Sequence, residues 1–291
     1  MNRRYFRINE DAPLFNKLSQ RPLWWEMLLD DKELYVNIRK DNRVNVYYRG
    51  ASIMSLSFKD NKIDAEIHNY YLGAYKDGTD YYGNKHCSPE EIVRQLSAIK
   101  IKVDSNKKYI ACFPGQEKNG KNYSSEKYVQ SQLFLADSHY IDTEFALQLD
   151  DRTVVRIDLV KLTDDGEIAF QELKLIDDLR LKPSGENPAE ILTQMANYDR
   201  FLKEANLLKG DDGEAIIVEY YKKVLNVMSA IGVKHIAAVP TSVRGYVDLF
   251  IKQIYTKKTI KRNHLVQSVL NVCKDLHSNV EDVSKEYGQL I

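Results

Sequence analysis

Two strand-length runs joined by a tight turn constrain the fold of this chain more than any other feature. The runs TVVRIDLVKL (153–162) and EIAFQELKLI (167–176) flank TDDG, whose Asp-Gly pair is typical of a β-hairpin. Inside these apolar runs lie three charged residues, Asp158, Glu172 and Lys174. Charged side chains are rarely buried unless they pair or bind something, so the hairpin requires either a salt bridge or a chemical site.

The spacing of the three charges indicates that they meet. Side chains two apart share one face of a strand, so Glu172 and Lys174 point the same way. Asp158 reaches that region from the preceding strand. Two carboxylates can hold Mg²⁺ together with phosphate oxygens, and a lysine beside them can position a water molecule. The alternative is a cross-strand ion pair of Asp158 with Lys174 or Arg156 on a partly exposed sheet face.

Composition limits the class of protein without naming its partner. Lys plus Arg equal Asp plus Glu at 42 each, so no global charge indicates nucleic acid, although a local patch can still bind it. The cysteines are far apart and predict free thiols in a reducing compartment: they are Cys87, Cys112 and Cys273. The start lacks an apolar signal segment, and no run approaches the roughly 18 apolar residues of a membrane span. We expect a cytoplasmic protein without a membrane partner.

Residues 1–88 are expected to form a β-rich module. Four strand-like runs cover 34–40, 43–50, 51–58 and 62–72, with polar breaks between them. The Gly-, Asp- and Tyr-rich segment 73–91 predicts a loop and a domain boundary. The role of this module is expected to be substrate recognition or dimerisation of the chain.

Residues 89–291 are expected to form a second domain that alternates helices and strands. Ser88-Pro89 predicts the start of a helix to about residue 101, because serine caps and proline suits the first helical position. Further elements are expected as a strand at 108–113, a helix from Ser124 or Ser125, strands at 140–149, 153–162 and 167–176, helices at 187–208 and 214–231, a strand at 234–240 and a closing helix at 263–289.

A second motif follows the hairpin. Gln194 and Tyr198 are four residues apart on the first expected helix after the Glu-x-Lys strand, so they share a helix face. The ordinary interpretation is that Tyr198 packs in the core and Gln194 is solvated. Its place directly after the charged hairpin favours a functional interpretation.

With these motifs in order, the chain resembles the PD-(D/E)XK nuclease superfamily, in its RecB-like branch with a Gln-xxx-Tyr helix. The resemblance covers about residues 124–240 and implies a restriction-endonuclease-like αβββαβ core, an α/β fold with a mixed sheet of the α+β kind. Ile157 replaces the proline of the family name, a position that makes no ligand. The helix around residue 126 lacks the histidine that some RecB-like members use as a further ligand.

The resemblance also implies residue roles. Asp158 and Glu172 are implied as metal ligands, with the Leu173 carbonyl as a third. Lys174 is implied near the attacking water, and Gln194 and Tyr198 are implied to orient Lys174 or the substrate strand. The family also uses an acid on its first core helix; Glu126 best matches that place and Glu144 is the runner-up.

The resulting prediction is a nuclease that depends on Mg²⁺, with Mn²⁺ able to substitute, and that hydrolyses phosphodiester bonds, with DNA favoured over RNA. One alternative is a non-catalytic nucleic-acid-binding protein that keeps the nuclease fold. A third interpretation is an interaction protein in which the charged strand forms only ion pairs. Calorimetry with a divalent metal and a nucleic-acid ligand distinguishes the three.

Overall fold

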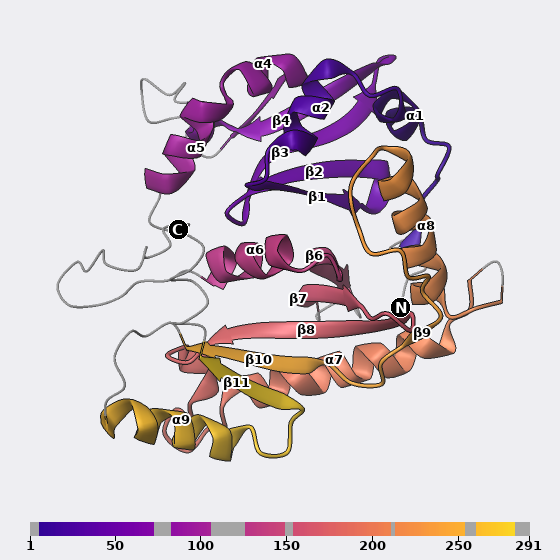
Figure 1. Ribbon diagram of the computed structural model, residues 1–291. Helices are drawn as coiled ribbons and strands as arrows, with labels where there is room; N and C mark the ends of the chain where they lie inside the picture. The colour runs from indigo at the N-terminus through magenta and orange to yellow at the C-terminus, as the bar shows by residue number, and fades with distance from the viewer. Residues whose placement is uncertain are drawn as a thin grey trace.

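The structure is a computed structural model that describes residues 6–72, 83–105, 126–148, 154–210, 213–253 and 260–282. In these ranges the chain forms two β-sheets with helices packed around them, which confirms the expected mixed α/β fold (Figure 1). The strand expected at 108–113 lies outside the described residues.

The N-terminal sheet is an antiparallel meander in the order β1-β2-β3-β4-β5. Its strands are β1 (Leu34–Arg39), β2 (Arg43–Tyr48), β3 (Ala51–Lys59), β4 (Lys62–His68) and β5 (Asn84–Cys87), with a 3₁₀ turn η2 (Lys40–Asn42) after β1. The first three expected strands are confirmed, whereas the fourth, expected over 62–72, ends at His68 and is followed by the helix α3 (Asn69–Leu72). The expectation of an unbroken loop at 73–91 is wrong, because β5 pairs with β4 there. This short edge strand is almost fully exposed, so it lacks the apolar alternation by which strands are recognised.

Two tight turns connect the meander at positions with positive φ, as two-residue hairpins require. Asp60 and Asn61 have φ of 48° and 60° in the β3–β4 turn, and Arg49 and Gly50 have φ of 49° and 80° in the β2–β3 turn. A Cβ at Gly50 would lie 2.5 Å from the Lys127 carbonyl oxygen. Glycine is therefore needed both for the turn and for its contact with the helix that carries Lys127.

Helices cover one face of the N-terminal sheet (Figure 1). They are α1 (Pro13–Ser19), α2 (Leu23–Asp30), α3 (Asn69–Leu72), α4 (Pro89–Arg94) and α5 (Leu96–Ser105). The predicted helix start at Ser88 is confirmed, since its hydroxyl accepts from the Glu91 amide at 3.3 Å. The helix is interrupted at Gln95 and extends beyond residue 101. Because α4 contacts β3 and β4, it packs with the N-terminal sheet although it follows the expected boundary.

The second sheet has the order β11-β10-β8-β7-β6, with β9 beside β8. Its strands are β6 (Tyr140–Gln148), β7 (Val154–Leu162), β8 (Glu167–Leu175), β9 (Ser242–Val243), β10 (Asp248–Gln253) and β11 (Ser278–Asp282). Strands β6, β7 and β8 form the expected antiparallel meander, whereas β10 runs parallel to β8 and β11 runs parallel to β10. The predicted TDDG hairpin is confirmed, with Gly166 at φ 85°.

Helices lie on both faces of this second sheet. They are α6 (Glu126–Ala136), α7 (Glu190–Leu207), α8 (Ile216–Ala230) and α9 (Ile260–Val272), with a 3₁₀ turn η3 (Leu179–Leu181) before α7. Helix α6 lies between the two sheets, and α7 covers the opposite face (Figure 1). None of the described helices is both long and apolar enough to cross a membrane.

Two expectations in the C-terminal part are wrong. Residues 234–240 form no strand; the parallel neighbours of β8 are β9 and β10, and Val239 is 61% exposed. The closing helix expected over 263–289 ends at Val272 and is followed by β11. The run at 234–240 has no periodicity that separates a strand from a surface segment, and Ser278–Asp282 form a strand because they pair with β10; long-range pairing decides in both places.

Polar side chains join the facing edge strands β1 and β6. The Arg39 guanidinium lies 2.6 Å from the Asp142 carboxylate, which also accepts from the Tyr221 hydroxyl at 3.2 Å. Asn37 and Thr143 are bonded at 2.6 Å beside this pair. Buried apolar residues from both sheets form one continuous core around these contacts. The N-terminal module and the second sheet are therefore packed as one body through this seam.

We expect Arg39→Met to lower the free energy of unfolding by about 3–5 kcal/mol, because it leaves the Asp142 charge buried without its partner. The double variant Arg39→Met/Asp142→Leu removes both charges and should recover most of this loss. Urea unfolding of both variants measures the difference. Equal losses in the single and double variants would contradict the assignment of a coupled buried pair.

Candidate functional site

The three charged residues of the hairpin meet at the end of the β7–β8 ladder. Paired residues run from Leu162 opposite Ile168 to Leu159 opposite Gln171. Asp158 is the next residue, and its Oδ2 accepts from the Leu173 amide at 2.9 Å. Where the backbone pairing of β7 and β8 ends, the Asp158 side chain thus provides the next hydrogen bond between the two strands. This contact holds the carboxylate beside the Glu-x-Lys segment, as the sequence predicted.

The Lys174 ammonium lies among the oxygens that the sequence proposed for a metal ion. Its Nζ donates to Glu172 Oε1 and, at 2.9 Å, to the Leu173 carbonyl oxygen. Asp158 Oδ2 lies 3.8 Å from the same nitrogen. Two carboxylates and one carbonyl therefore converge on a single cation position, and in this arrangement the cation is the lysine.

Gln194 and Tyr198 on α7 hold the Glu172 carboxylate. Gln194 Nε2 donates to Glu172 Oε1 at 2.6 Å, and the Tyr198 hydroxyl lies 2.8 Å from Glu172 Oε2. Gln194 and Tyr198 are also bonded to each other at 2.6 Å, so they share a face as predicted. The sequence implied that they would orient Lys174 or a substrate strand. In the structure, Gln194 and Tyr198 bond the Glu172 carboxylate, and this same carboxylate accepts from Lys174.

The two candidates for a further acid occupy different surroundings. Glu126, at the start of α6, is 30% exposed and lies 3.6 Å from the Arg180 guanidinium. The charges of Lys174 and Asp158 act on its carboxyl group, so it belongs to the cluster. Glu144 pairs with Lys127 at 2.8 Å. The Glu144 charge in turn raises the pKa of Asp158, so both acids lie near the cluster.

Negative charge exceeds positive charge in the buried part of the cluster. Burial and the Glu172 charge raise the pKa of Asp158 to about 8. Burial raises the pKa of Glu126 to about 7, and the Asp158 charge adds to this. The pKa of Lys174 is raised because the charges of Glu172 and Asp158 outweigh the effect of burial. Asp158 and Glu126 therefore bind protons near neutral pH, which removes part of this negative charge, and a bound cation would displace those protons.

The donor set fits a hard divalent cation in its chemistry. Carboxylate and carbonyl oxygens are the ligands that Mg²⁺ prefers, and it commonly uses only one or two carboxylates. Within the described ranges, no three His, Cys, Asp or Glu side chains lie close enough to form a metal-binding group. A divalent ion here would thus depend on Asp158, Glu172 and the Leu173 carbonyl, with the Lys174 ammonium moved aside.

Access to the cluster is narrow. The side chains of Glu172 and Lys174 are each 1% exposed, whereas that of Asp158 is 13% exposed. The partly exposed rim consists of Asp158, Glu126 and Arg180. A phosphate would therefore approach from the rim, where Arg180 and Glu126 are more exposed than Asp158.

Sequence reasoning missed two residues around the cluster. Gln130 is buried and donates to the Asp158 backbone carbonyl, which fixes the strand end at the site. It lies four residues after Glu126 on α6, a helical spacing that could have identified it. Arg180 bonds Asp178 at 2.6 Å and neighbours Glu126. No sequence pattern indicated Arg180, because the η3 turn that positions it is recognised only in the structure.

We expect Tyr198→Phe to lower the free energy of unfolding by about 1–3 kcal/mol, because the Glu172 carboxylate and the Arg156 carbonyl lose a buried donor. Tyr246→Phe is the control, because its ring stacks on His277 away from the cluster. The control should change stability by less than about 0.5 kcal/mol. Equal effects in urea unfolding would show that the Tyr198 hydroxyl does not support the site.

Comparisons with known proteins do not add to this geometry. No protein-family model matches the chain, and neither the curated proteins nor the solved structures contain a match. The function is therefore inferred from the arrangement of the chain's own residues.

Proposed function

We propose that this protein is a metal-dependent nuclease that hydrolyses phosphodiester bonds, with DNA favoured as the substrate. The observation that carries the proposal is the convergence of Asp158, Glu172 and the Leu173 carbonyl on one cation position beside a rim open to solvent. The order α6, β6, β7, β8, α7, α8, β9, β10 supports it, because it follows the αβββαβ order that the PD-(D/E)XK resemblance implies except for the added α8 and the short β9.

In the proposed mechanism, Asp158, Glu172 and the Leu173 carbonyl would hold Mg²⁺ or Mn²⁺. When bound, the ion supplies positive charge to the phosphate and acidifies water. Gln194 and Tyr198 keep the Glu172 carboxylate in one orientation. Lys174, displaced from between the acids, donates to the attacking water or to the phosphate. Glu126 at the rim, with its pKa raised to about 7 by burial, is suited to accept a proton near neutral pH.

A structural ion-pair cluster is the rival interpretation, and a specific observation favours it. Lys174 and Glu172 are almost fully buried and already bonded, as in a site that only stabilises the fold. A non-catalytic nucleic-acid-binding protein is the second rival. A cytoplasmic location and a homodimer remain predictions from the sequence, and the proposal depends on neither.

We expect the wild-type chain to cleave DNA in Mg²⁺ or Mn²⁺ and to lose this activity in EDTA. Asp158→Asn should reduce the cleavage rate by at least about 100-fold, because it removes a ligand charge while preserving shape. Lys174→Ala should do the same. Asp199→Asn is the matched control, because this exposed acid lies on α7 outside the cluster. Thermal unfolding of each variant checks that its fold is retained.

The substrates are supercoiled plasmid, linear duplex and single-stranded DNA. Full metal-dependent activity in folded Asp158→Asn and Lys174→Ala would refute the assignment of these residues. Absence of cleavage by the wild-type chain on all three substrates would favour the rivals.

Calorimetric titration with Mn²⁺ separates the nuclease from the ion-pair cluster. We expect the wild-type chain to bind Mn²⁺ and Asp158→Asn to bind it at least about tenfold more weakly, because metal affinity depends on the charge of the ligands. Lys174→Ala should retain or increase the affinity, because the competing ammonium is gone. No heat of binding in the wild-type chain or in Lys174→Ala is the result expected of a purely structural cluster.

A further inference from the structure

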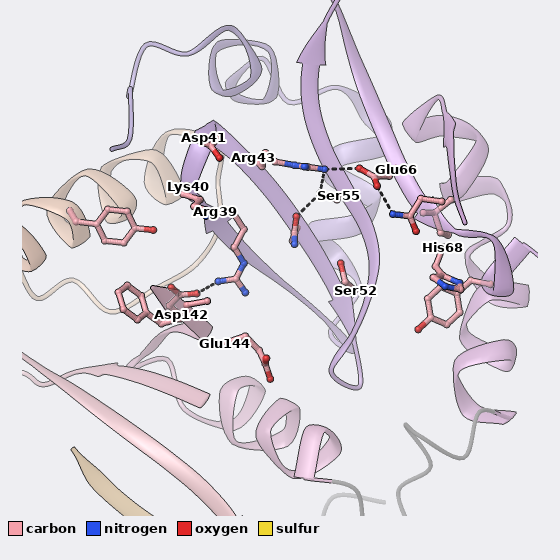
Figure 2. A pocket seen from close by; sticks show the side chains of 17 residues that line it. Arg39, Lys40, Asp41, Arg43, Ser52, Ser55, Glu66, His68, Asp142 and Glu144 are labelled. Atoms are coloured by element: carbon pink, nitrogen blue, oxygen red, sulfur yellow. Dashed lines mark hydrogen bonds and ion pairs between the residues drawn. The ribbon is translucent and has the colours of Figure 1, made fainter. Parts of the chain in front are cut away.

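A cavity of about 530 Å³ lies between the N-terminal sheet and β6, away from the charged cluster (Figure 2). The polar face of the N-terminal sheet forms its floor, with side chains from β2, β3, β4 and β5. The residues Asp142–Ala146 of β6 form the opposite wall. Its volume is in the range of small-molecule sites and can hold one nucleoside.

The floor is a continuous hydrogen-bonded network. Its members are Arg39, Arg43, Asn45, Ser55, Glu66 and Asn84. Arg43 donates to Glu66 at 2.7 Å and to Ser55 at 3.0 Å, and Ser55 donates to Asn45 at 2.7 Å (Figure 2). Because each side chain is held by its neighbours, the floor is preorganised for a polar ligand.

This network still offers hydrogen bonds to a ligand. Amide and hydroxyl groups can both donate and accept, so Asn45, Ser55 and Asn84 present both functions. Arg43 Nε is a buried donor that has no acceptor among the residues that the structure describes. The floor thus suits a ligand with alternating donors and acceptors.

The charges of the cavity are balanced, which argues against a phosphate. The lining acids are Asp41, Glu66, Asp142 and Glu144, and the lining bases are Arg39, Lys40 and Arg43. Lys127 pairs with Glu144 from outside the lining and balances the fourth acid. A phosphate group would find no net positive charge here. A neutral polar group would not be repelled.

Aromatic and aliphatic groups complete the cavity. Tyr71, Phe145 and Tyr220 are part of the lining, together with Ile67. A planar heterocycle can pack its apolar faces against such groups while its edge bonds the polar floor. Nucleobases have this combination of properties.

The cavity lies one strand away from the candidate catalytic acids. In the β6–β7 register Thr143 faces Leu159 and Phe145 faces Ile157, so Glu144 lies opposite Asp158. Residues so placed in antiparallel strands are about 5 Å apart between Cα atoms. Glu144 has a φ of 54°, a strained conformation of the kind that gathers at functional positions. A DNA strand with one phosphate at Asp158 can therefore place a neighbouring nucleotide in the cavity.

We propose that this cavity binds an unstacked nucleobase with its sugar, belonging to a single DNA strand whose neighbouring phosphate reaches the Asp158 cluster. The second half of this statement rests on the proposed nuclease function. A base within a duplex is stacked and paired, so it enters the cavity only at the cost of unstacking. Single-stranded DNA is therefore the preferred substrate.

The test measures binding without cleavage, in EDTA, by fluorescence anisotropy of a labelled single-stranded 12-nucleotide DNA. Ser52→Trp fills the cavity from β3, and Ala146→Trp fills it from β6; both positions are exposed in its lining. Each should weaken binding at least about tenfold, because base contacts of this kind contribute about 1–3 kcal/mol. Ser57→Trp, on β3 outside the lining, is the control and should stay within about twofold.

Two further ligands identify what the cavity recognises. A strand with abasic sites should bind about tenfold more weakly than the normal strand, since its bases are missing. Blunt duplex of the same sequence should also bind more weakly. Free deoxyadenosine that binds in a manner sensitive to Ser52→Trp, while the strand does not, would reassign the cavity to a free nucleoside and overturn the strand proposal.

Cleavage is measured separately, so the two proposals can fail independently. Unchanged affinity for single strands in folded Ser52→Trp and Ala146→Trp overturns the base-binding cavity, whatever the cleavage assay gives. Loss of binding in these variants in a protein that cleaves nothing leaves the cavity assigned and refutes only the nuclease. Equal binding of duplex and single strand overturns the substrate preference.

Discussion

The buried ammonium of Lys174 is the interaction on which the rest of the site depends. Moving a charge out of water costs several kcal/mol unless partners compensate it. Here the partners come from Asp158 on β7, from Glu172 and the Leu173 carbonyl on β8, and indirectly from Gln194 and Tyr198 on α7. One charge thus requires two strands and a helix to meet in a fixed arrangement. Any ligand that replaces the Lys174 ammonium is surrounded by the same groups in the same arrangement.

The contacts of this cluster stabilise the fold and also position the residues of the proposed chemistry. A structural cluster needs its charges matched, whereas this cluster contains Asp158, Glu172 and the partly exposed Glu126 around one buried lysine. The raised pKa values of Asp158 and Glu126 result from burial and from the neighbouring acids. With pKa values this high, Asp158 and Glu126 hold protons near neutral pH, and a cation that binds at the rim would displace those protons.

The side-chain contacts between β1 and β6 also cover a sheet edge. Strand β6 is an edge of its sheet, and exposed edges invite unwanted pairing. In this protein side chains cover the edge, with Arg39 bonded to Asp142 and Asn37 to Thr143. Arg39 and Asp142, which join β1 and β6, also belong to the lining of the polar cavity.

The sequence by itself predicted most of the local elements and the central residues of the site, although not Gln130 or Arg180. Period-two alternation and the Asp-Gly turn predicted β7 and β8, and helical spacing placed Gln194 beside Tyr198. The charged residues of the site were recognised because a charge inside an apolar strand requires either a partner or a ligand. These features depend on residues close together in the chain.

Only the tertiary structure decided how distant segments combine. It selected Asp248–Gln253 over residues 234–240 as the neighbour of β8, added β5 to the meander and packed α4 on the N-terminal sheet. The tertiary structure also places Gln194 and Tyr198 against Glu172. It forms a cavity between β6 and the polar face of the N-terminal sheet. The physical reason is that strand pairing, burial and cavity shape depend on contacts between residues far apart in sequence, which local periodicity does not encode.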